Sequence, residues 1–308
     1  MIDSYYKFSQ FLKERYGEKV WKISIDAGFT CPHWDKETGK EGCVFCRNDS
    51  FSDLQSKYNV SIEEQVASGI LAAREKYNVR KFIVYFQAST NTFAPVSVLQ
   101  DYFERAISFD GVVGLSVSTR PDCLPPRVLE LVDKLTKKTD VWIELGLQSV
   151  HEKTLKLLNR GHTFEDYQNA VAALKNLPVR ICTHLMIGLP GEDRQDLLVT
   201  AKEIADSGIH EVKLHPLLVL DDTPLAEMFR KGEFRSLQLD EYASLVCDFL
   251  EYLPPSMVIQ RLTAEAPEHM LLAPRWSLNK LNVIKRIEQE FKRRGTRQGQ
   301  HHSPNSSH

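Results

Sequence analysis

Three of the six cysteines lie in one short segment, with a spacing that suits a metal centre. Cys43 and Cys46 form a Cys-x-x-Cys pair, and Cys31 lies eleven intervening residues upstream. The charged, glycine-containing insert between them predicts a loop that brings the third thiolate to the same metal. Three thiolates suit an iron–sulfur cluster with one open position, or structural zinc completed by His33 or Cys123. The spacing leaves both open, whereas a disulfide is disfavoured because nothing marks the chain as secreted.

The elements that must position these cysteines alternate along the chain. Strands are expected at residues 20–25, 81–86, 112–118, 141–147, 179–187 and 211–218. Helices are expected at residues 62–77, 96–107, 125–135, 151–158, 164–174 and 194–205. This alternation predicts a parallel sheet with crossover helices. Six strands are too few for a closed eight-stranded barrel, so we expect an open, partial (β/α)6 TIM-type barrel. A doubly wound sheet is the alternative, although no Gly-x-Gly-x-x-Gly follows the first strand.

The pattern divides the chain into four parts. We expect an N-terminal helix in residues 1–19, the barrel core in 20–230 and a small α-rich C-terminal extension in 231–294. The extension has a helix at 239–253, a short strand at 258–262 and a long basic helix from Trp276 to Arg294. Residues 295–308 are polar and poor in apolar side chains, which predicts disorder.

Composition excludes several classes of protein. The 308 residues are 42% hydrophobic and carry a net charge of −2, which is typical of a globular protein with a full core. A charge this small provides no global attraction to nucleic acid or membrane. The start has no signal-peptide pattern, and no apolar run is long enough to span a bilayer. We therefore expect a cytoplasmic protein, without a membrane partner, in which thiols stay reduced.

Polar residues follow each predicted strand. Because ligands bind at the carboxyl edge of parallel sheets, we expect these residues to converge on one rim beside the cysteines. The groups are residues 87–92 (QASTNT), Ser116 to Arg120, Glu144 with Gln148 and Ser149, His184 to Gly191, and Lys213 with His215. Hydroxyls, amides and a cation near a metal suit a ligand that carries a ribose and an amino-acid group. Each group alone is weak evidence, since a single histidine at a strand end is more often structural.

Taken together, these motifs resemble those of the radical S-adenosylmethionine (SAM) superfamily, and within it the YhcC/YtqA-type subfamily. The resemblance covers residues 20 to about 290. The matching segments are Lys22 to Pro32, Gly42 to Cys46, Tyr85 to Thr92, Ser118 to Asp122, Glu144 to Ser149, Arg160 to His162 and His184 to Gly191. The commonest motif of the superfamily is Cys-x-x-x-Cys-x-aromatic-Cys. Here the first gap is longer, as in this subfamily and in the Elongator catalytic subunit, and the aromatic Phe45 is kept.

The resemblance implies a 4Fe-4S cluster held by Cys31, Cys43 and Cys46, with SAM on the fourth iron. One electron from the cluster would cleave the S–C bond of SAM and release a 5′-deoxyadenosyl radical that abstracts a hydrogen atom. The implied SAM contacts are the backbone of Gln87, Ala88 and Ser89 for the amino group, Ser118 and Gln148 for the ribose, Arg160 for the carboxylate, and Phe45, Ile187 and Gly188 for the adenine. In related enzymes an acid often stands in place of Ser118. The residues left for catalysis are Glu144, His184 and Lys213, and those left for the substrate are Asn91 and Arg120.

The subfamily resemblance implies a tRNA substrate, whose wobble uridine would be converted from 5-carboxymethylaminomethyl to 5-aminomethyl. The basic segment from Lys280 to Arg297 would meet RNA phosphates, although a solvated helix face explains it equally simply. A reducing partner such as flavodoxin or ferredoxin would supply the electron. Two alternatives remain: a radical SAM enzyme acting on a small metabolite, and a zinc-stabilised binding protein without catalysis.

Overall fold

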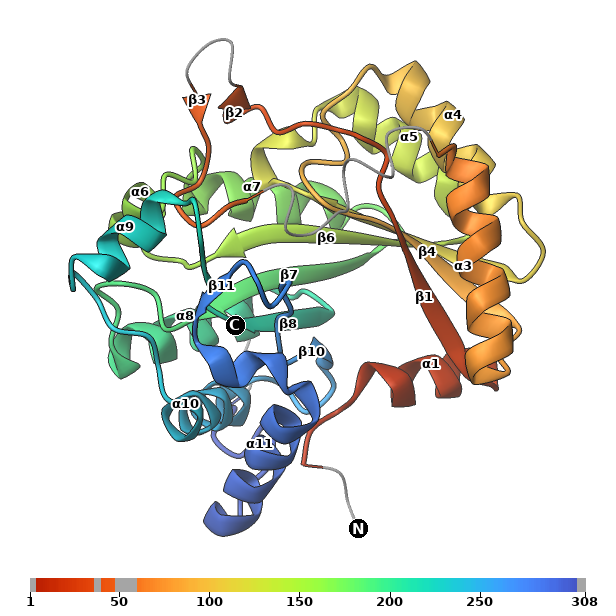
Figure 1. Cartoon of the computed structure of the whole chain (residues 1–308). Helices are drawn as coiled ribbons and strands as arrows, with labels where there is room; N and C mark the ends of the chain where they lie inside the picture. The colour runs from red at the N-terminus through yellow and green to blue at the C-terminus, as the bar shows by residue number, and fades with distance from the viewer. Residues whose placement is uncertain (1–3, 36–39, 48–59, 304–308) are drawn as a thin grey trace.

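The computed structural model describes residues 4–35, 40–47 and 60–303, and a curled sheet of seven parallel strands forms its centre (Figure 1). The order of the strands in the sheet is β1-β4-β5-β6-β7-β8-β10. Their bounds are β1 Val20–Ile25, β4 Lys81–Phe86, β5 Val112–Thr119, β6 Asp140–Gln148, β7 Arg180–Ile187, β8 Glu211–Pro216 and β10 Val258–Arg261. The predicted partial TIM-type barrel is thus confirmed.

The strand count differs from the prediction, because the sheet contains seven strands instead of six. The additional strand is β10, which the sequence pattern placed in the C-terminal extension. It pairs in parallel with β8, with Val258 opposite Glu211 and Ile259 opposite Val212. Ile259 N also donates to the carbonyl oxygen of Tyr6 across 2.8 Å, so the segment before the first helix borders this edge of the sheet.

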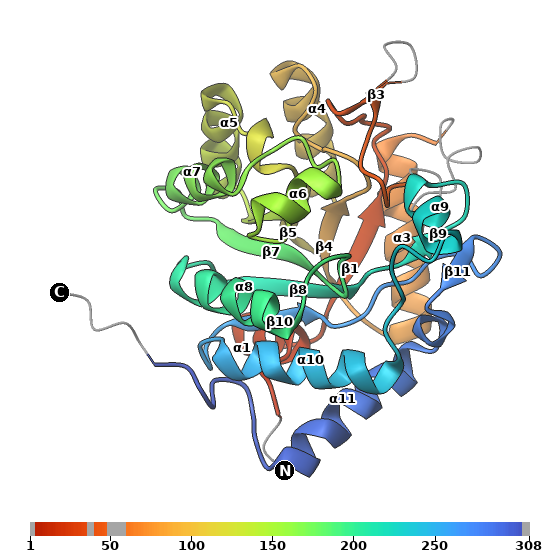
Figure 2. The same cartoon turned by 90° about the vertical axis from the view of Figure 1, so that its left-hand side faces the viewer.

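Helices cover the outer face of the sheet and close one end of it (Figures 1 and 2). Their bounds are α1 Phe8–Tyr16, α3 Ile62–Tyr77, α4 Val96–Ile107, α5 Pro126–Thr136, α6 Glu152–Leu157, α7 Phe164–Leu174, α8 Arg194–Asp206, α9 Pro224–Arg230, α10 Leu239–Tyr252 and α11 Lys280–Arg294. Short elements complete the chain: β2 Trp34–Asp35, β3 Lys40–Glu41, β9 Val219–Leu220, β11 Leu271–Ala273, and the 3-10 turns η2 Pro121–Cys123 and η3 Arg275–Leu278. Among the helices of the described ranges, none is long and apolar enough to cross a membrane.

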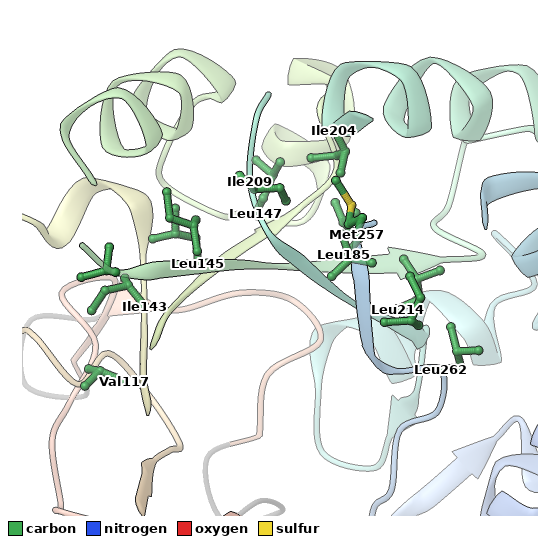
Figure 3. Packing of buried hydrophobic residues seen from close by; sticks show 14 of the residues in the cluster. Val117, Ile143, Leu145, Leu147, Leu185, Ile204, Ile209, Leu214, Met257 and Leu262 are labelled. Atoms are coloured by element: carbon green, nitrogen blue, oxygen red, sulfur yellow. The ribbon is translucent and has the colours of Figure 1, made fainter. Parts of the chain in front are cut away.

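The two faces of the sheet differ in chemistry because successive side chains of a strand point in opposite directions. One set packs against the helices as the main hydrophobic core, which includes Val117, Ile143, Leu145, Leu185 and Leu214 (Figure 3). The other set faces the concave side of the sheet and is mainly polar. We call this side the lumen.

Helix α1 closes the lumen at the amino ends of the strands. Leu12 of α1 packs in a small apolar cluster with Val20, Ile83 and Trp142. The ring of Phe8, also of α1, lies edge-on to the indole of Trp142, with 6.5 Å between the ring centroids. The lumen therefore has an apolar floor, and its opposite end is where the strands deliver their carboxyl-terminal loops.

Residues 295–303 are ordered, contrary to the prediction of a disordered tail. The side chain of Gln298 is buried and donates to the carbonyl oxygens of Pro254 (2.7 Å) and Met257 (2.8 Å), and its own oxygen accepts from Tyr6 N (2.8 Å). A polar segment can thus be held by hydrogen bonds to backbone groups, which composition does not reveal. Residues 304–308 lie outside the described ranges.

The long basic helix is also shorter than predicted. It begins at Lys280, because residues 275–278 form the 3-10 turn η3 and Asn279 caps the helix by accepting from Asn282 N.

Candidate active site

The three predicted ligands lie on a loop that short contacts hold in place. Cys46 N donates to the carbonyl oxygen of Cys43 across 2.9 Å, so the Cys-x-x-Cys segment forms a tight turn, and Trp34 N donates to that of Cys31 across 3.0 Å. Cys43 is buried, Cys31 is half-buried and Cys46 is exposed. The two turns thus present the three thiols on one loop, with Cys46 open to solvent.

Two other segments fix this loop against the barrel. Val44 N donates to the carbonyl oxygen of Leu158, just after α6, and Leu225 N at the start of α9 donates to that of Val44. His33, the alternative zinc ligand, instead lies 3.0 Å from the side-chain oxygen of Asn159. Cys123, the other alternative, is buried and lies beside Asp122.

Arg160 connects the cysteine loop to the end of β6. Its guanidinium donates to Cys43 Sγ at 3.1 Å and to the carbonyl oxygen of Gly146 at 2.6 Å, and it lies 5.9 Å from the ring centroid of Phe45. The carbonyl oxygen of Arg160 in turn accepts from Arg120 at 2.6 Å. Three predicted residues, Phe45, Arg160 and Cys43, are therefore brought together.

Arg120 and Asn91, both predicted to contact substrate, are buried and brace the loops. Besides Arg160, the guanidinium of Arg120 binds Asp122 through two contacts of 2.9 Å. The amide of Asn91 donates to the carbonyl oxygens of Ala88 (2.7 Å) and Ser118 (3.0 Å), which joins the loop after β4 to the end of β5. The loop of Gln87, Ala88 and Ser89 is thus fixed next to Ser118.

Unpartnered polar atoms remain at this rim. Within the described part of the chain, Gln148 Oε1 and Asn91 Oδ1 are buried and have no hydrogen-bond partner. A Cβ added at Gly146 would lie 3.3 Å from both Arg160 Nη2 and Gln148 Nε2, so Gly146 allows these two side chains to approach each other.

Ile187 and Gly188 lie at the end of β7. The side chain of Ile187 belongs to the outer core, so only its backbone can contribute to the rim. Gly188 has a φ of 91°, and a Cβ there would lie 2.8 Å from Leu237 Cδ1. Both constraints favour glycine at this position.

A buried ionic cluster lies in the lumen, formed by side chains from β1, β5, β6, β7 and β8. At its centre is the fully buried carboxylate of Glu144. Oε1 accepts from Lys22 Nζ (2.5 Å) and Ser116 Oγ (2.6 Å), and Oε2 binds Lys213 Nζ and His184 Nε2 (2.7 Å). The strands β1 and β6 are separated in the sheet by β4 and β5, so the contact between Lys22 and Glu144 requires a strongly curled sheet. The predicted catalytic set of Glu144, His184 and Lys213 is therefore one contact group.

The cluster shifts the ionisation of its members. Burial alone would raise the pKa of Glu144, but Lys213, Lys22 and His184 reverse this effect and hold the pKa well below its usual value. Burial and then Lys213 lower the pKa of His184 to about 4, despite the opposing effect of Glu144. Burial, followed by the charge of Glu144, raises the pKa of Tyr85 and of Cys182 well above their usual values. Near neutral pH Glu144 is thus ionised, whereas His184 is neutral and Tyr85 and Cys182 keep their protons.

Glu144, Cys182 and His184 place possible ligand atoms within 4.8 Å of one another. The carboxylate already has two lysine partners, however, and the thiol is protonated. This arrangement favours ion pairing over a metal ion.

Sequence reasoning missed Lys22 and Tyr85 as members of this cluster, whereas Ser116 was expected among the converging polar residues. The ammonium groups of Lys22 and Lys213 lie 4.4 Å and 4.2 Å from the ring centroid of Tyr85. Alternation within the strands was the available signal, because each of these residues stands between two side chains that face the outer core or the apolar floor.

The residues present fit the cluster and SAM that the motifs imply. Cys31, Cys43 and Cys46 occupy one loop, a cation donates to one of their sulfurs, and the orphaned oxygens of Gln148 and Asn91 border the same rim. Buried polar atoms without partners are uncommon in proteins, and a polar ligand at the rim can supply those partners. The cysteines would hold the cluster, and the rim would hold SAM.

Comparisons with known proteins agree with this fit. Residues 39–204 match the model of the radical SAM superfamily, and residues 209–293 match that of the Radical_SAM C-terminal domain. The chain is 40% identical to the uncharacterised protein YtqA of Bacillus subtilis (strain 168), covering 96% of this chain and 92% of YtqA. It is 36% identical to protein YhcC of Escherichia coli (strain K12), covering 94% and 92%.

A more distant relative is the tRNA uridine(34) acetyltransferase of Methanocaldococcus infernus, which is 28% identical and covers 60% of this chain and 34% of the relative. Among solved structures, archaeal Elp3 from the same organism superimposes with a TM-score of 0.72 at 21% identity, covering 91% of this chain and 64% of Elp3. This superposition shows that the two proteins share a fold.

Family and fold agree, and the superfamily binds a 4Fe-4S cluster and SAM, so these are the cofactors of this chain, while Cys31, Cys43 and Cys46 stay the predicted cluster ligands. The chain belongs to the radical SAM superfamily, in the YhcC/YtqA-type subfamily.

Proposed function

We propose that this radical SAM enzyme modifies the wobble uridine of tRNA, removing the carboxymethyl unit of a 5-carboxymethylaminomethyl group to leave 5-aminomethyl. The observation that carries the proposal is the polar lumen, closed at one end by α1 and lined by the cluster around Glu144. A base with a charged substituent suits such polar surroundings better than an apolar substrate does. The similarity to a tRNA uridine(34) acetyltransferase adds support for uridine.

The rim residues have proposed roles toward SAM. The backbone of Gln87, Ala88 and Ser89 receives its amino group, Arg160 its carboxylate, and Ser118 and Gln148 its ribose. Phe45 and the backbone of Ile187 and Gly188 contact the adenine. When bound, the cluster supplies one electron that cleaves the S–C bond of SAM, and the resulting radical takes a hydrogen atom from substrate. The electron comes from a reduced donor such as flavodoxin or ferredoxin.

The protein residues orient the substrate in the lumen. Glu144 stays ionised, and His184 stays neutral at its pKa of about 4, so the proposed role of His184 is to hold the carboxylate of Glu144 through Nε2 and not to take a proton from the substrate. The hydrogen atom would be removed from the carbon between the substituent nitrogen and the carboxylate. Return of one electron from that carbon to the cluster would leave an imine, and water would hydrolyse it to the 5-aminomethyl group and a two-carbon aldehyde acid. An anticodon base is single-stranded and can be turned out of its stack into a pocket.

The basic helix α11 offers fewer cations for RNA than its sequence suggests. Arg286, Arg293 and Arg294 all bind Glu290, and Arg294 is largely buried. The exposed lysines Lys285 and Lys292 are the proposed phosphate contacts on this helix.

A second candidate is a radical SAM enzyme that acts on a small metabolite. The observations that favour it are the net charge of −2 and the intramolecular pairing of the arginines on α11. A large RNA interface usually carries more free positive charge.

Nucleoside mass spectrometry on tRNA from a strain lacking the gene tests the proposal. We expect wobble uridines to stall at the 5-carboxymethylaminomethyl stage, and the reconstituted enzyme with SAM and a reductant to convert that tRNA. An unchanged nucleoside profile, together with no conversion by the reconstituted enzyme, would contradict the tRNA proposal and favour a metabolite.

A further inference from the structure

Within the described residues, the contact group around Glu144 holds two lysines and one carboxylate. Lys22 and Lys213 both bind the single carboxylate of Glu144, so two ammonium groups face one anion. The neighbouring ion pair of Arg180 and Glu211 has no net charge.

The other titratable groups that face this cluster do not supply the missing charge. His184 is neutral because burial and Lys213 lower its pKa to about 4, and burial lowers the pKa of His215 well below its usual value. The high pKa values of Tyr85 and Cys182 keep both groups protonated. In the described ranges, the cluster around Glu144 therefore keeps an unbalanced positive charge.

The two lysines retain donors for a further partner. An ammonium group has three N–H donors. In the part of the chain that the structure describes, Lys213 Nζ donates to Glu144 alone, and Lys22 Nζ donates to Glu144 and Gln260. Both ammonium groups lie over the ring of Tyr85, which places them on one side of the lumen. The side chains are 18% and 7% exposed, so Lys22 can be reached from solvent while both are partly desolvated.

We propose that Lys22 and Lys213 bind a single compact carboxylate on the substrate. The proposal rests on the proposed function, because a 5-carboxymethylaminomethyl group ends in such a carboxylate. One singly charged anion balances the excess charge, and its two oxygens can accept from both ammonium groups. A phosphate monoester carries about −1.5 to −2 charges near pH 7 and would overcompensate.

This site would also distinguish substrate from product. The product retains an aminomethyl group but lacks the carboxylate, so near neutral pH it brings a positive charge toward two lysines. Repulsion then favours product release, whereas the substrate carboxylate is attracted.

The charge balance predicts opposite effects for two substitutions. Lys213→Met leaves Lys22 paired one to one with Glu144, so carboxylate binding is weakened without leaving an unpaired charge. Glu144→Gln removes the competing anion and leaves both lysines for the ligand, so carboxylate binding becomes tighter. If the cluster had only a structural role, both variants would bind the carboxylate more weakly than wild type does.

Acetate and its neutral isostere acetamide are suitable probes for the anaerobically reconstituted enzyme, titrated by NMR with ¹³C-labelled ligand. We expect binding of acetate and none of acetamide. Relative to wild type, we expect about tenfold weaker acetate binding in Lys213→Met and about tenfold tighter binding in Glu144→Gln, as for the loss or gain of one charge-assisted contact. Lys134→Met, at an exposed position of α5, is the matched control and should bind as wild type does. If Lys213→Met fails to fold, Lys22→Met makes the same test.

Equal affinity for acetate and acetamide, or unchanged acetate binding in the lysine variants, would overturn the carboxylate site. The second arm compares anticodon stem-loop RNA whose wobble uridine carries either the carboxylate or the corresponding carboxamide. A preference for the carboxylate RNA that disappears in Lys213→Met supports the site. Acetate binding without any RNA binding would retain the site and remove the tRNA function. Conversion of tRNA without a preference for the carboxylate RNA would retain the tRNA function and remove the carboxylate site.

Discussion

The guanidinium of Arg160 donates a hydrogen bond to Cys43 Sγ across 3.1 Å. These residues come from segments that are distant in sequence, and the carbonyl oxygen of Gly146 fixes the same guanidinium from the other side. A cation is therefore held against one of the sulfurs that would ligate the cluster.

This contact predicts an effect on the reduction potential of the cluster. Hydrogen bonds and positive charge near the sulfurs stabilise the reduced, more negative state. Arg160→Met should therefore lower the potential, on the order of tens of millivolts, in a redox titration followed by electron paramagnetic resonance. Lys156→Met, at an exposed position of α6, is the control. An unchanged potential in Arg160→Met would show that the guanidinium does not influence the bound cluster.

Substitution of the cysteines tests the ligand set itself. Cys43→Ala should reduce the iron content from about four per chain to near zero and abolish formation of 5′-deoxyadenosine, because only two thiolates remain. Cys123→Ala is the matched control, since Cys123 is also buried but lies beside Asp122. The ligand assignment is wrong if Cys43→Ala still cleaves SAM, or if Cys123→Ala loses the cluster.

Much of the fold could be predicted because the strands and crossover helices leave strong periodic signals. The chemistry of the lumen was harder to predict. Three charged or polar residues stand out because they lie within strongly apolar strands: Glu144, His184 and Lys213. Lys22 lies in the middle of β1, where it resembles an ordinary alternating polar residue. Its role depends on the curl of the sheet, which brings β1 opposite β6, and periodicity within one strand carries no information about curl.

The C-terminal segment shows a different limit of sequence reasoning. Composition predicts disorder when apolar residues are scarce, but Gln298 is held by three hydrogen bonds to backbone groups. Such partners come from residues distant in sequence. The sequence of α11 also overstates its free positive charge. Acids from another helix bind its arginines, among them Asp248 and Glu251 of α10.

The buried Gln298 should contribute to stability. Gln298→Ala leaves backbone groups of Tyr6, Pro254 and Met257 without their side-chain partner, which should cost about 1–3 kcal/mol of unfolding free energy. Urea denaturation measures this loss, with Gln300→Ala at an exposed position as the control. Equal midpoints for Gln298→Ala and wild type would mean that the segment does not support the fold.

The low pKa of His184 predicts a pH dependence of stability. Its folded value of about 4 lies below its usual value of 6.5, so the unfolded chain binds more protons between these values. The contribution of His184 to the free energy of unfolding is thus complete above pH 6.5. It decreases by about 3 kcal/mol as the pH falls toward 4.

His184→Gln keeps a donor for Glu144 and removes the titration. The decrease in unfolding free energy between pH 6.5 and 4.5 should therefore be smaller in this variant than in wild type, in anaerobic urea denaturation at a series of pH values. Parallel pH profiles for the two proteins would show that His184 does not titrate below its usual range.

The last prediction separates the structural and RNA-binding roles of α11. Arg294 donates to Asp248 (2.7 Å), Glu251 (3.2 Å) and Glu290 (2.9 Å), and only 16% of its side chain is exposed. Arg294→Met should cost about 3–5 kcal/mol of stability, because three largely buried carboxylates lose a common partner. Lys292→Ala, two residues earlier and exposed, should change stability by less than about 0.5 kcal/mol.

The order of the two effects should be reversed for RNA binding, where Lys292→Ala should have the larger effect. If Lys292 contacts a phosphate, Lys292→Ala weakens tRNA binding and reduces the slope of log affinity against log salt by about 1. Formation of 5′-deoxyadenosine should be unchanged, because α11 is not part of the proposed SAM site. Binding isotherms at several salt concentrations measure both quantities. An unchanged salt slope in Lys292→Ala would place the RNA contacts on another surface and leave α11 with a structural role.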